Sequence, residues 1–280
     1  MTASSARTRR PATEGARWHR MNGRRRVAVV IGACAAAAII AAGAFSLASL
    51  SGRPLLSDEF SQPDGLITNE FAYYNPHSSA ARISPVWIAT SGSLFARDHA
   101  GWTGIPDVGT PGPASSPVTD SSVFRVVTRR SDFQNVAVSF GLDVQRFATP
   151  PGGTDLSWQG VHVFLRYQNP ALLYAVSVDR RDGRVVIKKK VPGGPTNGGT
   201  YYTLGTADEH AVSGQWEQVK VSVTNSGANV VLSAWLDGKL VLTATDDGIG
   251  DTAPISQPGR VGLRGDYTEF MFRSFAVTGS

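Results

Sequence analysis

Apolar and polar side chains alternate with a period of two in almost every apolar segment after residue 120. Between Val136 and Leu142 the large residues fall on one side of an extended chain and the small ones on the other. The segment from Trp216 to Val223 repeats the pattern. Because successive side chains of a strand point to opposite faces, the pattern predicts strands with one buried face. After Leu50 no window of twelve residues carries a helical stripe.

Two Asp-Gly pairs mark hairpin turns between such segments. Asp237-Gly238 and Asp182-Gly183 each separate two alternating runs, which is a strong hairpin signal. Short strands with Gly, Pro, Asn and Asp at the turns favour a β-sandwich or jelly roll. We therefore predict one all-β domain over residues 54–280. Weaker alternation between residues 66 and 117 predicts long loops packed over the sandwich.

The run from Val27 to Leu50 contains no charged residue and follows three arginines. A helix of this length reaches about 36 Å, enough to cross a bilayer core of about 30 Å. Because flanking positive charge stays in the cytoplasm, residues 27–50 are predicted to be a transmembrane signal-anchor helix. Residues 1–26 would be a disordered cytoplasmic tail and the β domain would be extracellular. A signal peptide cleaved near Ala44 or Ala48 is the alternative.

The net positive charge belongs entirely to the first 26 residues. They hold eight arginines and one acid, Glu14, which leaves 19 basic and 21 acidic residues in the remainder. A basic nucleic-acid-binding domain is therefore excluded, and no nucleic-acid partner is expected. Cys34 is the single cysteine, so the β domain has no disulfide. No zinc, nucleotide or phosphate-loop motif is present, and no cofactor is predicted apart from the Ca²⁺ hypothesis given below.

Five short segments resemble the concanavalin A-like lectin/glucanase superfamily, which includes laminin-G-like jelly rolls. They are residues 214–221, 236–240, 259–263 and 270–277, and the opening Asp58-Glu59-Phe60, which is expected to pair beside the last strand. The resemblance covers most of residues 57–280 and implies a concanavalin A-like β-sandwich that holds an extended sugar chain on a concave sheet face. It specifies a fold more than an activity. The glutamates outside residues 1–50 do not form the Glu-x-Asp-x-x-Glu strand of the superfamily's glucanases.

Two predicted strands offer side chains for such a face. In the strand 160–168, period two places His162, Phe164, Arg166 and Gln168 together. In the strand 184–190, either Lys188 and Lys190 line the groove or Lys189 lines it alone. The simpler interpretation of the first strand is a solvated outer face. The simpler interpretation of the second is an edge strand that its lysines protect from aggregation.

Cations beside aromatic rings suit acidic polysaccharides, because the ring stacks on the sugar and the cation meets its carboxylate or sulfate. The main hypothesis is therefore a membrane-tethered module that binds cell-envelope or extracellular polysaccharide. The loop 91–104 adds aromatic and charged groups, and Trp158 lies in a polar loop just before the first of these strands. The predicted glycan contacts are Arg97, Trp102, Trp158, His162, Arg166, Lys188, Lys190 and Tyr202.

A polysaccharide lyase acting on an acidic polymer is the enzymatic alternative. Alginate-type lyases on β-jelly rolls are similar in the residue types they use, and the resemblance implies three roles. Arg166 or Gln168 would neutralise a uronate, His162 would abstract the C5 proton, and Tyr201 or Tyr202 would protonate the leaving oxygen. A protein-interaction or adhesion role, as in laminin-G-like domains, is the third possibility.

The acidic loop that follows the hairpin at Asp237-Gly238 could supply oxygen ligands to Ca²⁺. Asp246, Asp247 and Asp251 stand there with two glycines. Laminin-G-like domains often hold calcium at a sandwich edge, so the resemblance implies the same here. A solvated acidic hairpin loop is the alternative, since no EF-hand spacing is present.

Overall fold

The computed structural model describes residues 53–109, 120–121, 123–149, 155–209 and 214–280. They all belong to the compact unit that runs from Ala48 to Ser280. The predicted tail over residues 1–26 and the predicted transmembrane helix over residues 27–50 lie outside the described residues. Within the described ranges, no helix is long and apolar enough to cross a membrane.

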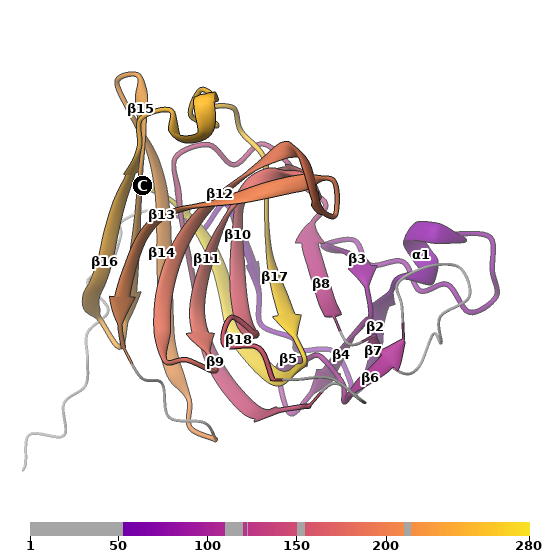
Figure 1. Cartoon of the computed structure of the whole chain (residues 1–280). Helices are drawn as coiled ribbons and strands as arrows, with labels where there is room; N and C mark the ends of the chain where they lie inside the picture. Colours follow the sequence, from indigo (N-terminus) through magenta and orange to yellow (C-terminus); the bar gives the residue numbers. More distant parts are fainter. Residues whose placement is uncertain (1–52, 110–119, 122, 150–154, 210–213) are drawn as a thin grey trace, which may run out of the picture. The chain divides into compact units, whose positions relative to one another are not determined.

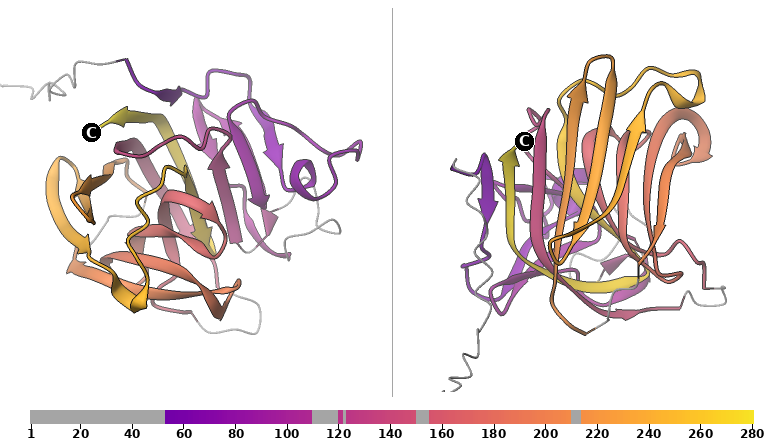
Figure 2. Two further views of the ribbon diagram at one scale, coloured as in Figure 1. Left: turned by 90° about the horizontal axis from the view of Figure 1, so that it is seen from above. Right: turned by 90° about the vertical axis from the view of Figure 1, so that its left-hand side faces the viewer.

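Two antiparallel sheets form a sandwich (Figures 1 and 2). In the described part of the chain the larger sheet has nine strands, with β1 (Leu56–Asp58) paired to β18. The others, in spatial order, are β16 (Lys239–Asp246), β15 (Asn229–Leu236), β14 (Glu217–Ser226), β9 (Val136–Phe147), β18 (Thr268–Gly279), β5 (Ala100–Trp102), β4 (Ser93–Arg97) and β2 (Gly65–Asn69). The predicted jelly-roll architecture is confirmed.

The second sheet has seven described strands, and it carries the candidate site described below. Its order is β13 (Gly199–Asp208), β12 (Arg184–Thr196), β11 (Leu172–Arg180), β10 (Gly160–Asn169), β17 (Arg260–Asp266), β8 (Val123–Thr128) and β3 (Trp87–Ser91). Beside the sandwich lie a parallel pair, β6 (Pro106–Gly109) and β7 (Asp120–Ser121), and the short elements α1 (Phe71–Tyr74) and η1 (Ile249–Asp251).

The alternating residues build the core as predicted. Val136, Val138, Phe140 and Leu142 of β9 are all buried in one hydrophobic cluster between the sheets. Within this core, Phe272 meets four other aromatic rings edge-on; these are Phe60, Trp87, Phe140 and Phe275. Such T-shaped contacts add about 0.5–1.5 kcal/mol per pair to the burial of the rings.

Both predicted hairpins are present. Asp237 and Gly238 join β15 to β16 with φ of 47° and 80°, the left-handed conformation that a two-residue hairpin turn requires. Asp182 and Gly183 join β11 to β12. The opening strand also pairs with the closing one as expected, with Leu56 opposite Val277.

The prediction of long loops between residues 66 and 117 is wrong for the part of this region that the structure describes. It contributes β2 to β6 and α1, and β3 extends the seven-stranded sheet. Residues on both faces of β3 and β4 are buried, as at Ala89, Thr90, Ser93 and Leu94. Because neither face is open to solvent, polar and apolar residues have no reason to alternate, and the period-two signal is lost.

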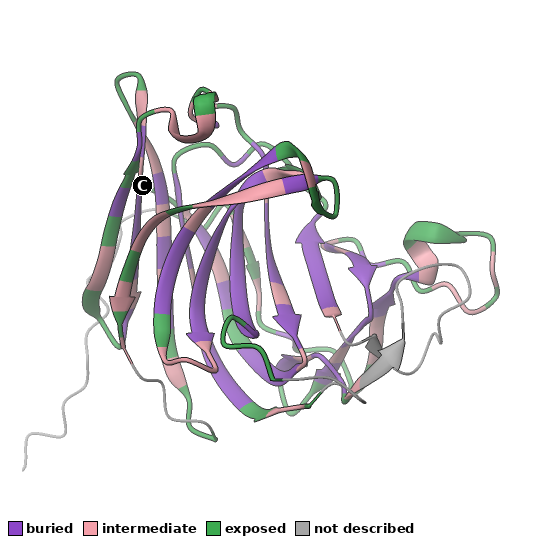
Figure 3. Ribbon diagram, viewed as in Figure 1, coloured by how far each residue is buried: buried purple, intermediate pink, exposed green. Residues whose placement is uncertain are grey.

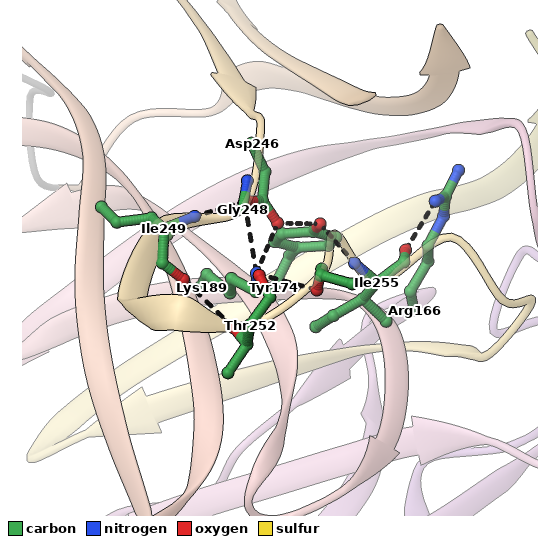
Figure 4. A network of polar contacts seen from close by, with 9 residues as sticks. Arg166, Tyr174, Lys189, Asp246, Gly248, Ile249, Thr252 and Ile255 are labelled. Carbon is green, nitrogen blue, oxygen red and sulfur yellow. Dashed lines mark hydrogen bonds and ion pairs between the residues drawn. The ribbon is translucent and has the colours of Figure 1, made fainter. Parts of the chain in front are cut away.

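A buried ion pair links the two sheets (Figure 4). The Lys189 ammonium of β12 lies 3.0 Å from a carboxylate oxygen of Asp246 at the end of β16, and both side chains are fully buried. Lys189 also donates to the carbonyls of Thr252 and Ala253, at 2.8 and 3.0 Å. The Tyr174 hydroxyl donates to Asp246 at 2.5 Å. The charges are thus paired and hydrogen-bonded, as buried charges require.

Removing one partner of this pair should destabilise the fold strongly. Asp246→Leu leaves the Lys189 ammonium buried without its counter-charge, which typically costs about 3–5 kcal/mol. The free energy of unfolding, measured by urea denaturation, should fall accordingly, and adding Lys189→Met should restore much of the loss. Asp132→Asn removes one partner of an exposed pair with Arg130 and should change little. A loss in Asp246→Leu no larger than in Asp132→Asn would contradict the assigned role.

Candidate functional site

A cavity of about 280 Å³ lies on the seven-stranded sheet, on the face turned away from the main core. Five neighbouring strands, β10, β11, β12, β13 and β17, supply most of its wall, and burial extends along the central strands (Figure 3). The residues that line the cavity are Trp158, His162, Phe164, Ala175, Ser177, Lys188, Thr196, Tyr201, Arg264 and Asp266.

The alternation of β10 sets which side chains reach the cavity. Val161 and Val163 point into the main core, while His162 and Phe164 line the cavity. The alternation then breaks, because the pairing with β11 shifts register between Leu165 and Asn169. After this bulge Tyr167 shares the face of Phe164, and their rings stack 5.7 Å apart.

The prediction that Arg166 lines the glycan site is therefore wrong. It adopts φ of 47° at the bulge and is fully buried. Its guanidinium donates to the carbonyls of Gln134 and Ile255 and to the side chains of Asn135 and Asn225, at 2.6 to 3.2 Å. Because its donors are used inside the protein, Arg166 cannot neutralise a uronate in the cavity.

Gln168 and Tyr202 are also kept away from the cavity. The Gln168 amide donates to the carbonyl of Pro258 at 2.7 Å. Tyr202 is paired with the inward-facing Lys189, and its ring packs so closely on Gly250 that an added Cβ would lie 2.7 Å away. Neither residue lines the cavity, so of the two predicted tyrosines only Tyr201 is placed for a role there.

The three consecutive lysines of β12 divide between the two faces. Lys188 lines the cavity, Lys190 lies on the same face, and Lys189 points into the sandwich. The ammonium groups of Lys188 and Lys190 lie 5.8 and 4.9 Å from the centre of the Tyr201 ring, within cation–π range. Lys188 and Lys190 thus share the outer face of the strand, but only Lys188 lines the cavity, and Lys190 is buried beside the Tyr201 ring.

Burial affects these groups in the expected directions. Burial lowers the pKa of Lys188, and burial together with the charge of Arg264 lowers the pKa of Lys190 to about 8. Lys190 also donates to the carbonyl of Pro170 at 2.6 Å. Burial raises the pKa of Tyr201. The cavity wall therefore places the Tyr201 phenol beside the Lys188 side chain, and the buried Lys190 contacts the same ring from outside the wall.

A hydrogen-bonded cluster forms the floor of the cavity. His162 Nε2 lies 3.0 Å from an Asp266 carboxylate oxygen, and His162 Nδ1 lies 2.8 Å from the Ser177 hydroxyl. Arg264 donates to Asp266 through Nε and Nη2, at 2.6 to 3.0 Å. The four residues come from three adjacent strands, β11, β10 and β17.

The protonation state of this cluster follows from its environment. Burial lowers the pKa of His162 below its usual value, although Asp266 partly opposes the shift. Burial alone would raise the pKa of Asp266, but the Arg264 charge and the His162 hydrogen bond outweigh it and hold that pKa well below the usual range. At neutral pH, Asp266 is an anion and His162 is neutral.

Two predicted contacts form a separate pair away from the cavity. The Arg97 guanidinium lies 4.8 Å from the Trp102 ring centre, and Trp102 Nε1 donates to Glu269 at 3.1 Å. Both residues belong to short strands of the larger sheet, β4 and β5. Trp158, in contrast, lines the cavity with 40 % of its surface exposed, as expected for a rim residue.

The Asp246 loop is arranged around a lysine. Asp246 receives the Lys189 ammonium, and its Oδ1 accepts the backbone N–H of Gly248 at 3.1 Å. Asp247 and Asp251 are exposed. Across the described residues, no group of three His, Cys, Asp or Glu side chains is arranged to hold a metal ion. Asp246, one of the three possible Ca²⁺ ligands, thus already has a cationic partner.

Sequence reasoning missed Ser177, Arg264 and Asp266. A local signal exists in β17, where the inward residues Val261 and Leu263 imply that Arg264 and Asp266 point outward. No local signal shows that β17 pairs with β10, because the two strands are far apart in the sequence.

Two further carboxyl groups, those of Asp179 and Glu217, have raised pKa values but lie outside the cavity. Asp179 and Glu217 are paired with the core residues Val161 and Leu142, which places them on the inner faces of the two sheets. Burial raises the pKa of Asp179 to about 6. Burial, and then the charge of Asp179, raises the pKa of Glu217 to about 7. Neither lines the cavity, so they do not act as a glycosidase acid pair there.

No family model matches the chain, and no curated protein matches it. Solved structures do match, and they are concanavalin A-like jelly rolls. One, from work on endo-acting O-glycanases with which prominent members of the human gut microbiota initiate mucin breakdown, is 10 % identical with a TM-score of 0.50. It covers 81 % of this chain and 100 % of that one.

Two others have lower scores. A galectin-like protein of unknown function from Bacillus subtilis is 12 % identical with a TM-score of 0.49, covering 81 % of this chain and 96 % of that one. An endo-1,3-β-glucanase from Streptomyces sioyaensis is 14 % identical with a TM-score of 0.46, covering 81 % and 97 %. At such identities a structural match defines the fold alone. The chain has the concanavalin A-like jelly-roll fold that its sequence predicts.

The raised pKa of Glu217 predicts a stability that falls as pH rises. An unfolded glutamate titrates near pH 4.3, whereas the folded one titrates at about 7. The folded state binds this proton more tightly, so the stability it contributes is complete below about pH 4 and is lost as pH approaches about 7. Glu217→Gln should therefore lose less stability than the wild type between about pH 5 and pH 8.

Thermal unfolding at both pH values measures this difference. Glu59→Gln makes the same chemical change at an exposed position and should follow the wild-type pH profile. If Glu217→Gln also follows that profile, the raised pKa of Glu217 is incorrect.

Proposed function

We propose that this protein is a membrane-tethered module that binds acidic glycan in the cavity of the seven-stranded sheet. The observation that carries the proposal is the pairing of the Tyr201 ring with the Lys188 and Lys190 ammonium groups on that face, next to the exposed Trp158 at the rim. Aromatic rings pack against the apolar faces of sugars, and cations meet their carboxylate or sulfate groups.

The charge of the cavity and its surroundings supports an acidic ligand. Lys188 and Arg264 line the cavity and Lys190 adjoins it, whereas Asp266 is the single acid among the lining residues. Asp266 is already bound through both oxygens by Arg264 and makes no ion pair with Lys188 or Lys190. A glycan that carries carboxylate or sulfate groups would supply the missing negative charge.

The geometry of the cavity does not favour a lyase with His162 as the base and Arg166 or Gln168 as the neutralising group. To abstract a C5 proton, His162 would need a ring nitrogen that faces the uronate, and its two ring nitrogens are hydrogen-bonded to Asp266 and to Ser177. Arg166 and Gln168, the candidate neutralisers, lie outside the cavity. Binding is therefore the function that the geometry supports best.

Glycan binding should depend on Tyr201 and Lys188. The full-length chain is titrated with acidic polysaccharides (polygalacturonate, alginate, chondroitin sulfate) and with neutral laminarin and dextran, by affinity electrophoresis. An acidic polymer should bind, and Tyr201→Ala should weaken binding by about tenfold or more, equivalent to about 1.4 kcal/mol. Lys188→Gln should weaken it and reduce its salt dependence.

The larger sheet offers a matched control. Lys220 and Trp235 form the same kind of contact, with the ammonium 4.9 Å from the ring centre, on strands β14 and β15. Lys220→Gln and Trp235→Ala should leave binding unchanged. Absence of binding to every polymer, or an equal loss in these controls, would contradict the proposed site.

The tether is supported by the uncharged run over residues 27–50 and the arginines before it. In a bacterial host, the full-length chain should remain in the membrane fraction after high-salt and carbonate washes and should be released by detergent. In spheroplasts, added protease should digest the domain, because it is expected outside. A chain without residues 1–50 is the control and should not pellet with the membrane. Release by the washes alone would contradict the tether.

A further inference from the structure

We propose that Ser177, His162 and Asp266 form a nucleophilic triad that hydrolyses small carboxylic esters in this cavity. The proposal rests on the hydrogen-bond chain among these residues and on their position in the cavity wall. The sugar nature of the ester's alcohol rests on the proposed glycan-binding function, whereas the triad itself does not.

The three residues occupy fixed positions in the middle of the sheet. His162 is directly opposite Ser177 of β11 on one side and Arg264 of β17 on the other. The relevant distances are 2.8 Å from the Ser177 hydroxyl to His162 Nδ1 and 3.0 Å from His162 Nε2 to Asp266. Side chains supported by paired strands are held more rigidly than side chains on loops, as a catalytic group requires.

The direction of the hydrogen bonds follows from the charge of Asp266. An ionised carboxylate only accepts hydrogen bonds, so His162 must donate to it from Nε2. Because a neutral imidazole carries a single N–H, His162 Nδ1 is then a lone pair. The Ser177 O–H must point at that lone pair. His162 is therefore placed to act as general base on Ser177, with Asp266 orienting the ring from the opposite nitrogen.

Lys188 is the group available for charge that develops on the substrate. Ser177 itself is paired on both sides, opposite His162 and Val186, so its backbone belongs to the sheet ladder. A side chain is therefore the candidate for stabilising an oxyanion there. Lys188 is opposite Ala175, two residues from Ser177 on the same face, and lines the same cavity. A lysine at this diagonal position on the neighbouring strand has a side chain long enough to reach an oxyanion formed at Ser177.

The reaction balances without any added oxidant or cofactor. The Ser177 oxygen bonds to the ester carbonyl carbon while its proton passes to His162 Nδ1. The tetrahedral intermediate then breaks its bond to the alcohol oxygen, which leaves with the proton from His162. Water attacks the resulting acyl-serine, gives a proton to His162, and Ser177 recovers that proton as the carboxylic acid departs.

The cavity fits a short acyl group. Its volume is about 280 Å³, and Phe164 and Ala175 provide apolar wall next to Ser177. An acetyl ester of a sugar hydroxyl matches this size and lining, with the sugar held against the rim at Trp158.

The test uses the full-length chain in a detergent that contains no ester. A fluorophosphonate probe is added to the native protein, which is then digested and mapped by mass spectrometry, and hydrolysis of p-nitrophenyl acetate is measured in parallel. Label on Ser177 and burst-phase release of p-nitrophenol are expected. The heat-unfolded chain is the control and should not label. Because labelling is mapped on the wild type, the result does not depend on the folding of a variant.

Substitutions then assign the roles. Ser177→Ala should abolish labelling and hydrolysis, and His162→Gln should lower the hydrolysis rate by about a hundredfold or more. Lys188→Gln should lower kcat more than it raises KM. Ser222→Ala, on the outer side of β14 in the other sheet, is the matched control and should hydrolyse at the wild-type rate. Thermal unfolding checks that each variant is folded.

The outcomes separate this proposal from the proposed function. Label at another residue, or neither label nor hydrolysis in the folded wild type, overturns the triad even if acidic glycan binds. Labelling of Ser177 without binding to any polysaccharide supports the triad and overturns the glycan-binding function. Ser177→Ala that loses ester hydrolysis but binds polysaccharide like the wild type supports both.

Discussion

The ion pair between Lys189 and Asp246 is the constraint around which the jelly roll is arranged. It bridges β12 of one sheet and β16 of the other inside the sandwich, and it holds the chain near Thr252 and Ala253 through backbone carbonyls. A buried lysine needs its counter-charge, so the two sheets have little freedom to shift at this end. Because side chains alternate along a strand, fixing Lys189 inward also fixes Lys188 and Lys190 outward.

Strand β12 therefore supplies both the buried Lys189, which pairs with Asp246 of the other sheet, and Lys188, which lines the cavity. The outward lysines meet Tyr201 of the neighbouring strand, and the rest of the cavity is completed by β10, β11 and β17. Charged groups gather on this face in two kinds of arrangement. Asp266 and Arg264 neutralise one another, and His162, which is hydrogen-bonded to Asp266 and Ser177, has its pKa lowered by burial. Lys188 lines the open space, whereas the Lys190 ammonium is buried and donates to the carbonyl of Pro170.

Much of the fold could be predicted from local patterns. The alternating segments and both Asp-Gly hairpins appear as expected, because each depends on a short stretch of sequence. The pairing of the first strand with the last was expected from the resemblance to concanavalin A-like domains, and it is present. The strands between residues 66 and 117 could not be recognised, since burial on both faces removes the alternation. Arg166 was misplaced because nothing local predicts the bulge that turns it inward. The cluster at His162 depends on pairing between distant strands, which one sequence does not show.

The pairing of β1 with β18 has a mechanical consequence for a domain held at its N-terminal side. Tension in the chain before Leu56 reaches the sandwich first through β1, whose ladder spans only three residue pairs, from Leu56–Val277 to Asp58–Phe275. β18 is secured independently by its long pairing with β9. Under load, β1 would peel away while the sheets stay closed. In the tethered arrangement proposed above, β1 would be a short extensible coupling between the jelly roll and its attachment.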